Sequence, residues 1–93
     1  MILYSDGIRD MVQSCRSLWL LDAIVSNQSK REMNKESFQE WELFRIGDSS
    51  FDVIGSDIKG NIITSQQIEY SDFKYDHCAI WLIKDRMILP REY

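Results

Sequence analysis

The stretch "FQEWELFRIGDSSFDVIGS", residues 38–56, decides the fold class of this chain. It is rich in aromatic and β-branched residues, which are enriched in strands. The tetrapeptide "GDSS" at its centre combines glycine with short polar side chains that favour turns. Residues 38–46 and 51–56 are therefore predicted to be two strands joined by a turn.

Two further segments extend this pattern toward the C-terminus. Gly60-Asn61 is a hairpin signal, and it precedes "IITSQQIEY", residues 62–70, which alternates as a third strand does. "HCAIWLIKDRMILPREY", residues 77–93, is compatible with a helix or a hairpin. The length of its two apolar runs favours two strands with a turn at Asp85-Arg86.

The N-terminal part of the chain is predicted to be helical. In "YSDG", residues 4–7, a serine and an aspartate can cap a helix. Apolar residues then recur every three or four positions from Ile8 to Trp19, as on one face of a helix. The regular spacing of this stripe is lost near Ser17. We therefore expect either a bend there or a second helix that Ser17 caps and that ends near Gln28.

The second helical segment differs from the first in its pattern. Residues 18–25 are apolar on nearly every side apart from Asp22, which is typical of a buried helix. The next segment, "NQSKREMNKES" at residues 27–37, is polar and has no period, so it is predicted to be a loop. Its basic residues can also be interpreted as a nucleic-acid patch, but the acidic segment that follows favours the loop.

The order of elements is therefore α-α-β-β-β-β-β with local connections. This order predicts an α+β fold in which two N-terminal helices pack on one face of an antiparallel sheet of about five strands. A length of 93 residues suits a single domain, residues 1–93, with one core.

Charge and composition limit the classes of function. The formal net charge is −4, and residues 36–76 carry nine acidic against three basic side chains, a net −6. Such a surface repels phosphate backbones, so we expect no direct nucleic-acid binding. The acids are also too sparse to mimic duplex DNA, which carries a charge about every 1.7 Å.

The sequence predicts a cytoplasmic protein without a metal or cofactor. No apolar run approaches the roughly 20 residues of a membrane helix, and the N-terminus lacks the pattern of a signal peptide. Cys15 and Cys78 are expected to be buried free thiols. Two cysteines and one histidine without paired spacing do not form a zinc site.

Five stretches of the chain carry a resemblance to a known family. They are "YSDG" (4–7), "WLLDAI" (19–24), "FQEW" (38–41), "IEYSDF" (68–73) and "LPREY" (89–93). In these the chain resembles a family of small uncharacterised bacterial proteins, found in phages, plasmids and cyanobacteria and classed as a domain of unknown function. It differs from members with Asn-Gly at the final turn, where it has Asp85-Arg86. The resemblance implies a compact one-domain fold and a mobile-element context, and no known activity.

The sequence contains no recognisable set of catalytic residues. His77 and Cys78 are neighbours in a predicted strand and should point to opposite faces, so they do not form a nucleophile–base pair. Cys15 lies on the apolar stripe, where an inert core thiol is expected. We therefore predict that the protein is not an enzyme. The alternative is a small enzyme or ligand-binding domain that uses Asp22 or His77.

The predicted sheet has a second, uncovered face that is also apolar. Trp41 and Leu43 should point to one side and Phe44 and Ile46 to the other, and Trp81 should oppose its apolar neighbours in the same way. The uncovered face would measure roughly 400 Å² in projection. This area suits the centre of an interface, which needs about 800 Å² per partner.

We therefore predict that this face binds a partner. The residues predicted to bind it are Glu40, Glu42, Phe44, Ile46 and Trp81. The partner is either a second copy, giving a homodimer, or a host protein. Because the chain is small, acidic and without a catalytic constellation, the leading hypothesis is a phage or mobile-element protein that inhibits a host defence nuclease of the CRISPR or restriction type.

Overall fold

The computed structural model describes residues 2–93 as three helices, six strands and a C-terminal 3₁₀ turn. The helices are α1 (Asp6–Cys15), α2 (Leu18–Asn27) and α3 (Arg31–Asn34), and the 3₁₀ turn is η1 (Pro90–Glu92). The strands are β1 (Leu3–Tyr4), β2 (Phe38–Arg45), β3 (Phe51–Ser56), β4 (Ile62–Ile68), β5 (His77–Ile83) and β6 (Arg86–Ile88).

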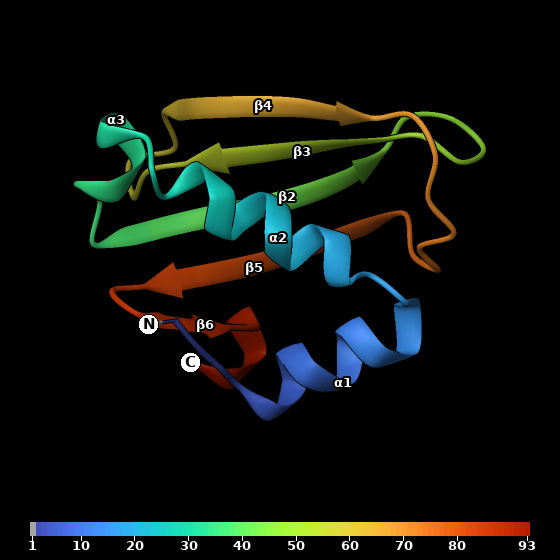
Figure 1. Ribbon diagram of the computed structural model, residues 1–93, viewed down its shortest axis with the longest axis horizontal. Helices are drawn as coiled ribbons and strands as arrows, with labels where there is room; N and C mark the ends of the chain where they lie inside the picture. The colour runs from blue at the N-terminus through green and yellow to red at the C-terminus, as the bar shows by residue number, and fades with distance from the viewer. Residues whose placement is uncertain (1) are drawn as a thin grey trace.

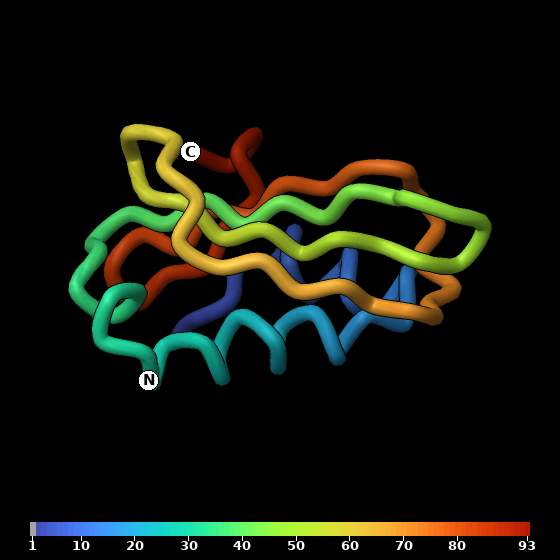
Figure 2. The backbone as a smooth tube through the Cα atoms, turned by 90° about the horizontal axis from the view of Figure 1, so that it is seen from above, coloured from blue at the N-terminus to red at the C-terminus, as the bar shows by residue number. Residues whose placement is uncertain are grey.

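All six strands belong to one sheet, whose order is β1-β6-β5-β2-β3-β4 (Figure 1). β2 pairs with β3 and β5, β3 with β4, and β5 with β6, all antiparallel. The predicted α+β fold, with N-terminal helices followed by strands, is confirmed. Because α1 and α2 lie on the same side of the sheet, its other face is left without a helix (Figure 2).

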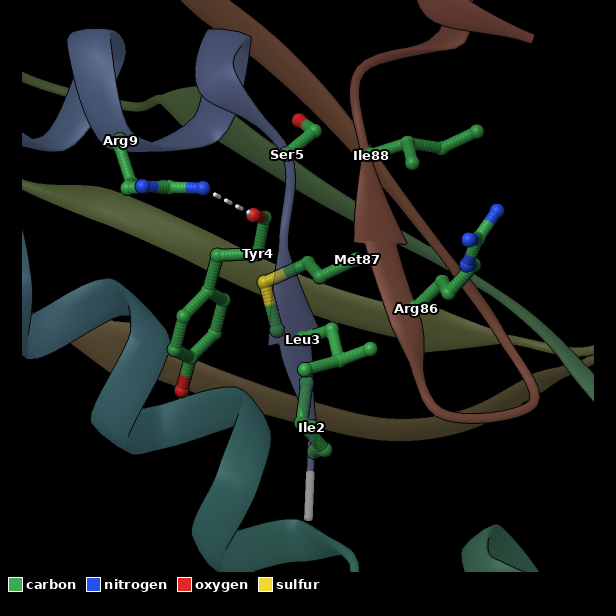
Figure 3. Close-up of a pocket in the computed structure, with 8 residues that line it drawn as sticks. All are labelled: Ile2, Leu3, Tyr4, Ser5, Arg9, Arg86, Met87 and Ile88. Atoms are coloured by element: carbon green, nitrogen blue, oxygen red, sulfur yellow. Dashed lines mark hydrogen bonds between the residues drawn. The ribbon is translucent and has the colours of Figure 1, made fainter.

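The sixth strand, β1, was not predicted, and it makes the sheet mixed rather than purely antiparallel. β1 pairs in parallel with β6, Leu3 opposite Arg86 and Tyr4 opposite Met87 (Figure 3). The N–H of Leu3 donates to the carbonyl of Asp85 at 2.7 Å, which ties the start of the chain to the last hairpin. A two-residue strand has no alternation of its own, so its partner alone defines it.

The break between α1 and α2 lies near Ser17, where the regular spacing of apolar residues is lost. Arg16 has a left-handed backbone with φ 50°, and its N–H donates to the carbonyl of Val12, so α1 ends there. Ser5 caps α1 as predicted, because its Oγ accepts from the N–H of Ile8 at 3.1 Å. Ser17 occupies the N-cap position of a second helix, as predicted, but its side chain makes no capping hydrogen bond. Its ψ of 36° is not the extended conformation of a cap, and its buried Oγ has no partner within residues 2–93.

α2 is not buried on every side, contrary to the sequence pattern. Leu20, Leu21 and Ile24 are buried against the sheet, whereas Leu18 and Val25 are exposed on the outer face of the helix. The reason is that a helix on a two-layer fold has only one covered face.

The predicted loop after α2 contains the short helix α3. Its Met33 is fully buried, and the carbonyl of Met33 accepts from Nε2 of the buried Gln39 at 3.0 Å. The side-chain amides of Gln39 and Gln28 also exchange two hydrogen bonds of 2.8 Å. A single buried methionine and this amide network therefore order a segment whose sequence has no apolar period.

The third predicted strand forms as β4, and its alternation is interrupted near its start. A bulge after Gly55 shifts the pairing of β3 with β4. As a result Ile63 packs against the core while Ile62 is 65% exposed. The last hairpin also forms, but the two residues between β5 and β6 are Lys84 and Asp85, one position earlier than predicted, with Lys84 at φ 57°.

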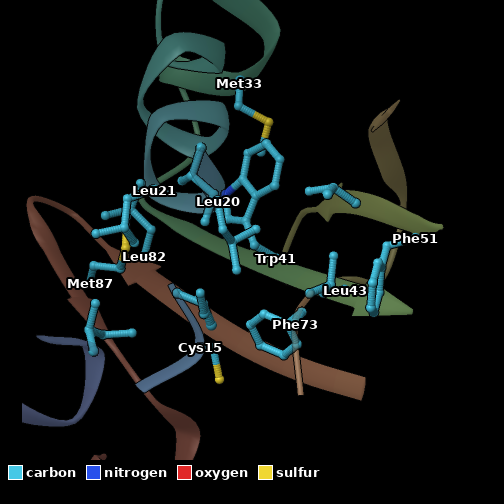
Figure 4. Packing of buried hydrophobic residues seen from close by; sticks show 14 residues of the cluster. Cys15, Leu20, Leu21, Met33, Trp41, Leu43, Phe51, Phe73, Leu82 and Met87 are labelled. Atoms are coloured by element: carbon cyan, nitrogen blue, oxygen red, sulfur yellow. The ribbon is translucent and has the colours of Figure 1, made fainter. Parts of the chain in front are cut away.

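The core fills the space between the helices and the sheet, and Trp41 lies at its centre (Figure 4). The indole Nε1 of Trp41 donates to Oε1 of Gln39 at 3.0 Å, which satisfies its only polar atom. Gly55, opposite Trp41 on β3, has no side chain to displace the ring. Cys15 is part of this core, as predicted.

Candidate protein-binding face

The face of the sheet without a helix is called the open face below. Its centre is formed by β2 and β5, which are neighbours in the sheet, with Glu40 opposite Trp81 and Phe44 opposite His77. The five residues predicted to bind a partner share this side: Glu40, Glu42, Phe44 and Trp81 lie on these strands, and Ile46 directly follows β2. The structure thus brings the predicted set together on adjacent strands.

Trp81 is the anchor of an aromatic group on the open face. Its Nε1 donates to Oε2 of Glu40 at 3.0 Å. The rings of Phe38 and Tyr93 meet the indole edge-to-face, at centroid distances of 5.4 and 5.7 Å. Edge-to-face contacts of this kind restrict the rings and give the face a defined shape.

A second polar pair lies farther along the same two strands. Nε2 of His77 is 2.9 Å from Oε2 of Glu42, and the imidazole is 4.8 Å from the ring of Phe44. The side chain of His77 is half exposed and that of Glu42 is 28% exposed, so both are available to a partner. The open face therefore repeats one arrangement, a carboxylate bonded to an aromatic ring nitrogen of the neighbouring strand.

The centre of the open face carries negative charge. Glu40 and Glu42 on β2 are joined there by Asp52, which lies opposite Phe44 on β3. Arg45, the only basic residue of β2, points to the other side. It is held by Asp76 at 2.8 Å and by the carbonyl of Phe73 at 2.9 Å, so its charge does not offset those of the open face.

Two aromatic residues of this group were missed by the sequence prediction. Phe38 has the same strand parity as Glu40 and Phe44, so alternation alone was a sufficient signal for it. Tyr93 lies after η1, outside any strand, and no local pattern indicated that it would return to Trp81.

The candidate catalytic residues are not brought together. His77 faces the open side, whereas Cys78 faces α1, where its Sγ is 3.3 Å from Sδ of Met11. Burial, followed by the proximity of Cys15, raises the pKa of the Cys78 thiol to about 11, so it is neutral at neutral pH. Asp22 is exposed on α2, on the helix layer.

A cavity of about 380 Å³ lies between α1 and the start of β5, and His77 and Cys78 line it together with Asp10 and Arg91. It places His77 beside a space for a small ligand. Asp22 takes no part in it. The two residues of the enzyme alternative therefore do not share a site.

Fold and site define this molecule as an α+β domain whose sheet is covered by helices on one side only. The chain belongs to the family of unknown function DUF6876, whose model matches residues 1–93. This confirms the predicted membership of a domain of unknown function. No curated protein and no solved structure matches the chain. No helix within residues 2–93 combines the length and apolar character needed to cross a membrane.

Proposed function

We propose that this protein is a cytoplasmic, non-enzymatic interaction domain that binds a host protein through the open face. The observation that carries the proposal is the pair of carboxylate–ring contacts, Glu40 with Trp81 and Glu42 with His77, on the two central strands. Aromatic side chains held in place lose little entropy on binding, and they dominate the energetics of protein interfaces.

The charge of the open face favours a partner with a basic surface. Within the described residues, Glu40, Glu42 and Asp52 have no lysine or arginine partner at its centre, and complementary charge steers association and suppresses wrong partners. Proteins that bind nucleic acid carry clustered lysine and arginine. A defence nuclease of the CRISPR or restriction type therefore has a surface of suitable chemistry, and the mobile-element resemblance favours the same class of target.

The proposal is tested by affinity capture from bacterial extract with the tagged protein and two variants. Trp81→Thr and Phe44→Thr keep strand-forming residues but remove the rings of the open face. The matched control is Leu18→Gln, which changes an exposed apolar residue on the helix layer. We expect a captured protein that the control retains and both open-face variants lose.

The captured protein is then identified and, if it is a nuclease, its cleavage is assayed with each variant. Capture that is equal for all variants contradicts binding through the open face. Capture of a protein without a nuclease role contradicts the defence target and leaves the binding site in place.

A second copy of the protein, giving a homodimer, is the other possible partner of the open face. Light scattering across a concentration series distinguishes it, because a dimer that Trp81→Thr dissociates means that the face binds a second copy. A monomer that binds no hydrophobic dye contradicts both forms of the proposal, since it means that the face is not available to a partner.

A small enzyme or ligand-binding domain remains the alternative function. The cavity beside His77 is the observation in its favour. A thermal-shift screen with small molecules tests it. A ligand that stabilises the protein, and that His77→Gln prevents from doing so, combined with no captured protein, places this alternative ahead.

A further inference from the structure

The edge of the sheet at β1 carries a second feature, separate from the open face. Parallel pairing directs the N–H groups of Leu3 and Ser5 to the carbonyls of Asp85 and Met87. In such a ladder the groups of the intervening residue, Tyr4, point away from the neighbouring strand. The outer edge of β1 therefore presents the N–H of Tyr4, whereas the carbonyl of Tyr4 accepts a hydrogen bond from Nη2 of Arg9.

This edge lies beside a cavity of about 530 Å³. Its lining includes residues of both β1 and β6, among them the apolar Leu3 and Ile88. Leu3 is 51% exposed although it belongs to the sheet. The edge thus combines an outward backbone N–H with an apolar surface, and an added strand uses both.

Two arginines flank the edge, one on each side of the sheet. Arg9 lies on the helix side, where its Nη2 donates to the carbonyl of Tyr4 at 3.3 Å, and Arg86 lies on the open side beside Leu3 and Ile88 (Figure 3). Arg9 is 3.4 Å from the highly exposed Asp6, and within residues 2–93 Arg86 has no ion pair. The exposed Asp85 directly precedes Arg86 in the chain, so the basic group at this edge that has no ion pair within residues 2–93 is Arg86.

A further carboxylate close to this end of the chain, that of Glu92, is already bound. Glu92 accepts from Oγ of Ser5 at 2.6 Å and from the N–H groups of Gly7 and Leu89 at 3.1 and 2.8 Å. Its charge is therefore directed to the start of α1 and not to the edge of β1.

We propose that the β1 edge binds an extended acidic segment of a partner protein by strand addition. Successive side chains of a strand point to opposite faces. Neighbouring acidic residues of the added segment therefore meet Arg9 on one side and Arg86 on the other, while its backbone pairs with Tyr4. Because its side chains alternate between the two faces, the added segment can place one acidic residue beside each arginine.

Peptide binding tests this assignment. The probe is a short fluorescent peptide in which pairs of adjacent glutamates alternate with pairs of valines, compared with the matching lysine–valine peptide and with the glutamate peptide methylated on alternate backbone nitrogens. We expect binding of the unmodified acidic peptide alone, because the methyl groups block pairing with the edge. Arg86→Glu should weaken it by about tenfold or more, since it places like charges together.

Arg31→Glu, the same charge change on α3, is the control and should bind as the wild type does. In amide NMR spectra the exchange of the Tyr4 N–H should slow when the acidic peptide is bound. Equal binding of the methylated peptide overturns the proposal, and so do amide changes confined to β4, the opposite edge. Dimerisation through β1 in the absence of peptide also overturns it, since the edge then binds a second copy.

Discussion

Trp41 shows how a single residue in the core depends on its neighbours. A Cβ added to Gly55 would lie 2.8 Å from Cη2 of the Trp41 ring, which is closer than real contacts of this kind. The ring is held on its other side by the hydrogen bond to Gln39, so it has little freedom to move away. The absence of a side chain at position 55 is therefore a packing requirement.

We predict that Gly55→Ala lowers the free energy of unfolding by about 1–3 kcal/mol, the usual cost of overpacking a core. Urea denaturation followed by tryptophan fluorescence measures it. Ser65→Ala, an exposed change on the neighbouring strand β4, is the control. A loss no larger than that of the control means that the indole has room that the structure does not show.

We also predict that both cysteines react slowly with thiol reagents in the folded protein. Cys15 is only 2% exposed, and burial raises the pKa of Cys78 to about 11, so little reactive thiolate exists at neutral pH. The rate for Cys78 should rise as the pH approaches 11. Labelling with and without denaturant, read by mass spectrometry, measures both rates. Rapid labelling of native Cys15 contradicts its place in the core.

The cap of α1 joins two elements at opposite ends of the chain. Glu92 of η1 accepts from Ser5, Leu89 and Gly7, and these hydrogen bonds lower the pKa of its carboxyl below the ordinary value of 4.5, with Ser5 the largest cause. A lowered pKa in the folded state means that the unfolded chain binds more protons in this range. The stabilisation is therefore present above about pH 4.5 and is lost as the pH falls through the folded value.

We predict that Glu92→Gln lowers the free energy of unfolding at pH 7, and that its difference from the wild type shrinks in acid. Chemical denaturation at pH 7 and near pH 3 measures the two differences. Glu69→Gln, which changes an exposed carboxyl after β4, should show neither effect. An equal loss at both pH values would mean that the glutamate acts through its shape and not through its charge.

The connection between α1 and α2 contains a residue in an unfavourable conformation. Arg16 adopts φ 50°, where residues with a Cβ are disfavoured and glycine is preferred. We predict that Arg16→Gly raises the free energy of unfolding by about 1 kcal/mol and that Arg16→Val lowers it. Thermal and urea denaturation of the two variants measure the changes. A glycine variant less stable than the wild type would mean that the arginine side chain stabilises the turn.

The elements that could be predicted from the sequence are those with a local signal of their own. β2 and β3 are rich in aromatic and β-branched residues and flank a turn, and α1 has both a cap and a stripe. β1 and α3 were missed because each depends on one distant contact. Leu3 pairs with Arg86, and Met33 enters a core built mainly by other elements. Local pattern contains no information about such partners.

The candidate binding face could be predicted in part, because alternation within a strand shows which residues share a side. The contacts between strands could not be predicted in this way. Parity separated Phe44 from Trp41 within one strand and Trp81 from its neighbours within another, but it did not relate the two strands to each other. The hydrogen bonds from Trp81 to Glu40 and from His77 to Glu42 required the register between β2 and β5, which alternation does not specify. The position of Tyr93 required the path of the chain after β6.

At the scale of the whole molecule, charge separates the classes of partner. Residues 36–76 carry a net −6, nine acids against three bases, and their acids include the carboxylates of the open face. We predict no measurable affinity for DNA or RNA at physiological salt, because phosphate binding requires clustered cations. A gel shift at micromolar protein measures it. A retarded band that high salt abolishes would contradict this prediction.

The pairing of β1 with β6 has a consequence for how the protein is made. Ser5 and Glu92, which together complete the start of α1, are 87 positions apart in the chain. During synthesis Ser5 leaves the ribosome well before Glu92, which is translated 87 positions later. The first strand and the first helix therefore wait, exposed to chaperones and proteases, until the final hairpin emerges. Contacts of such long separation also slow folding.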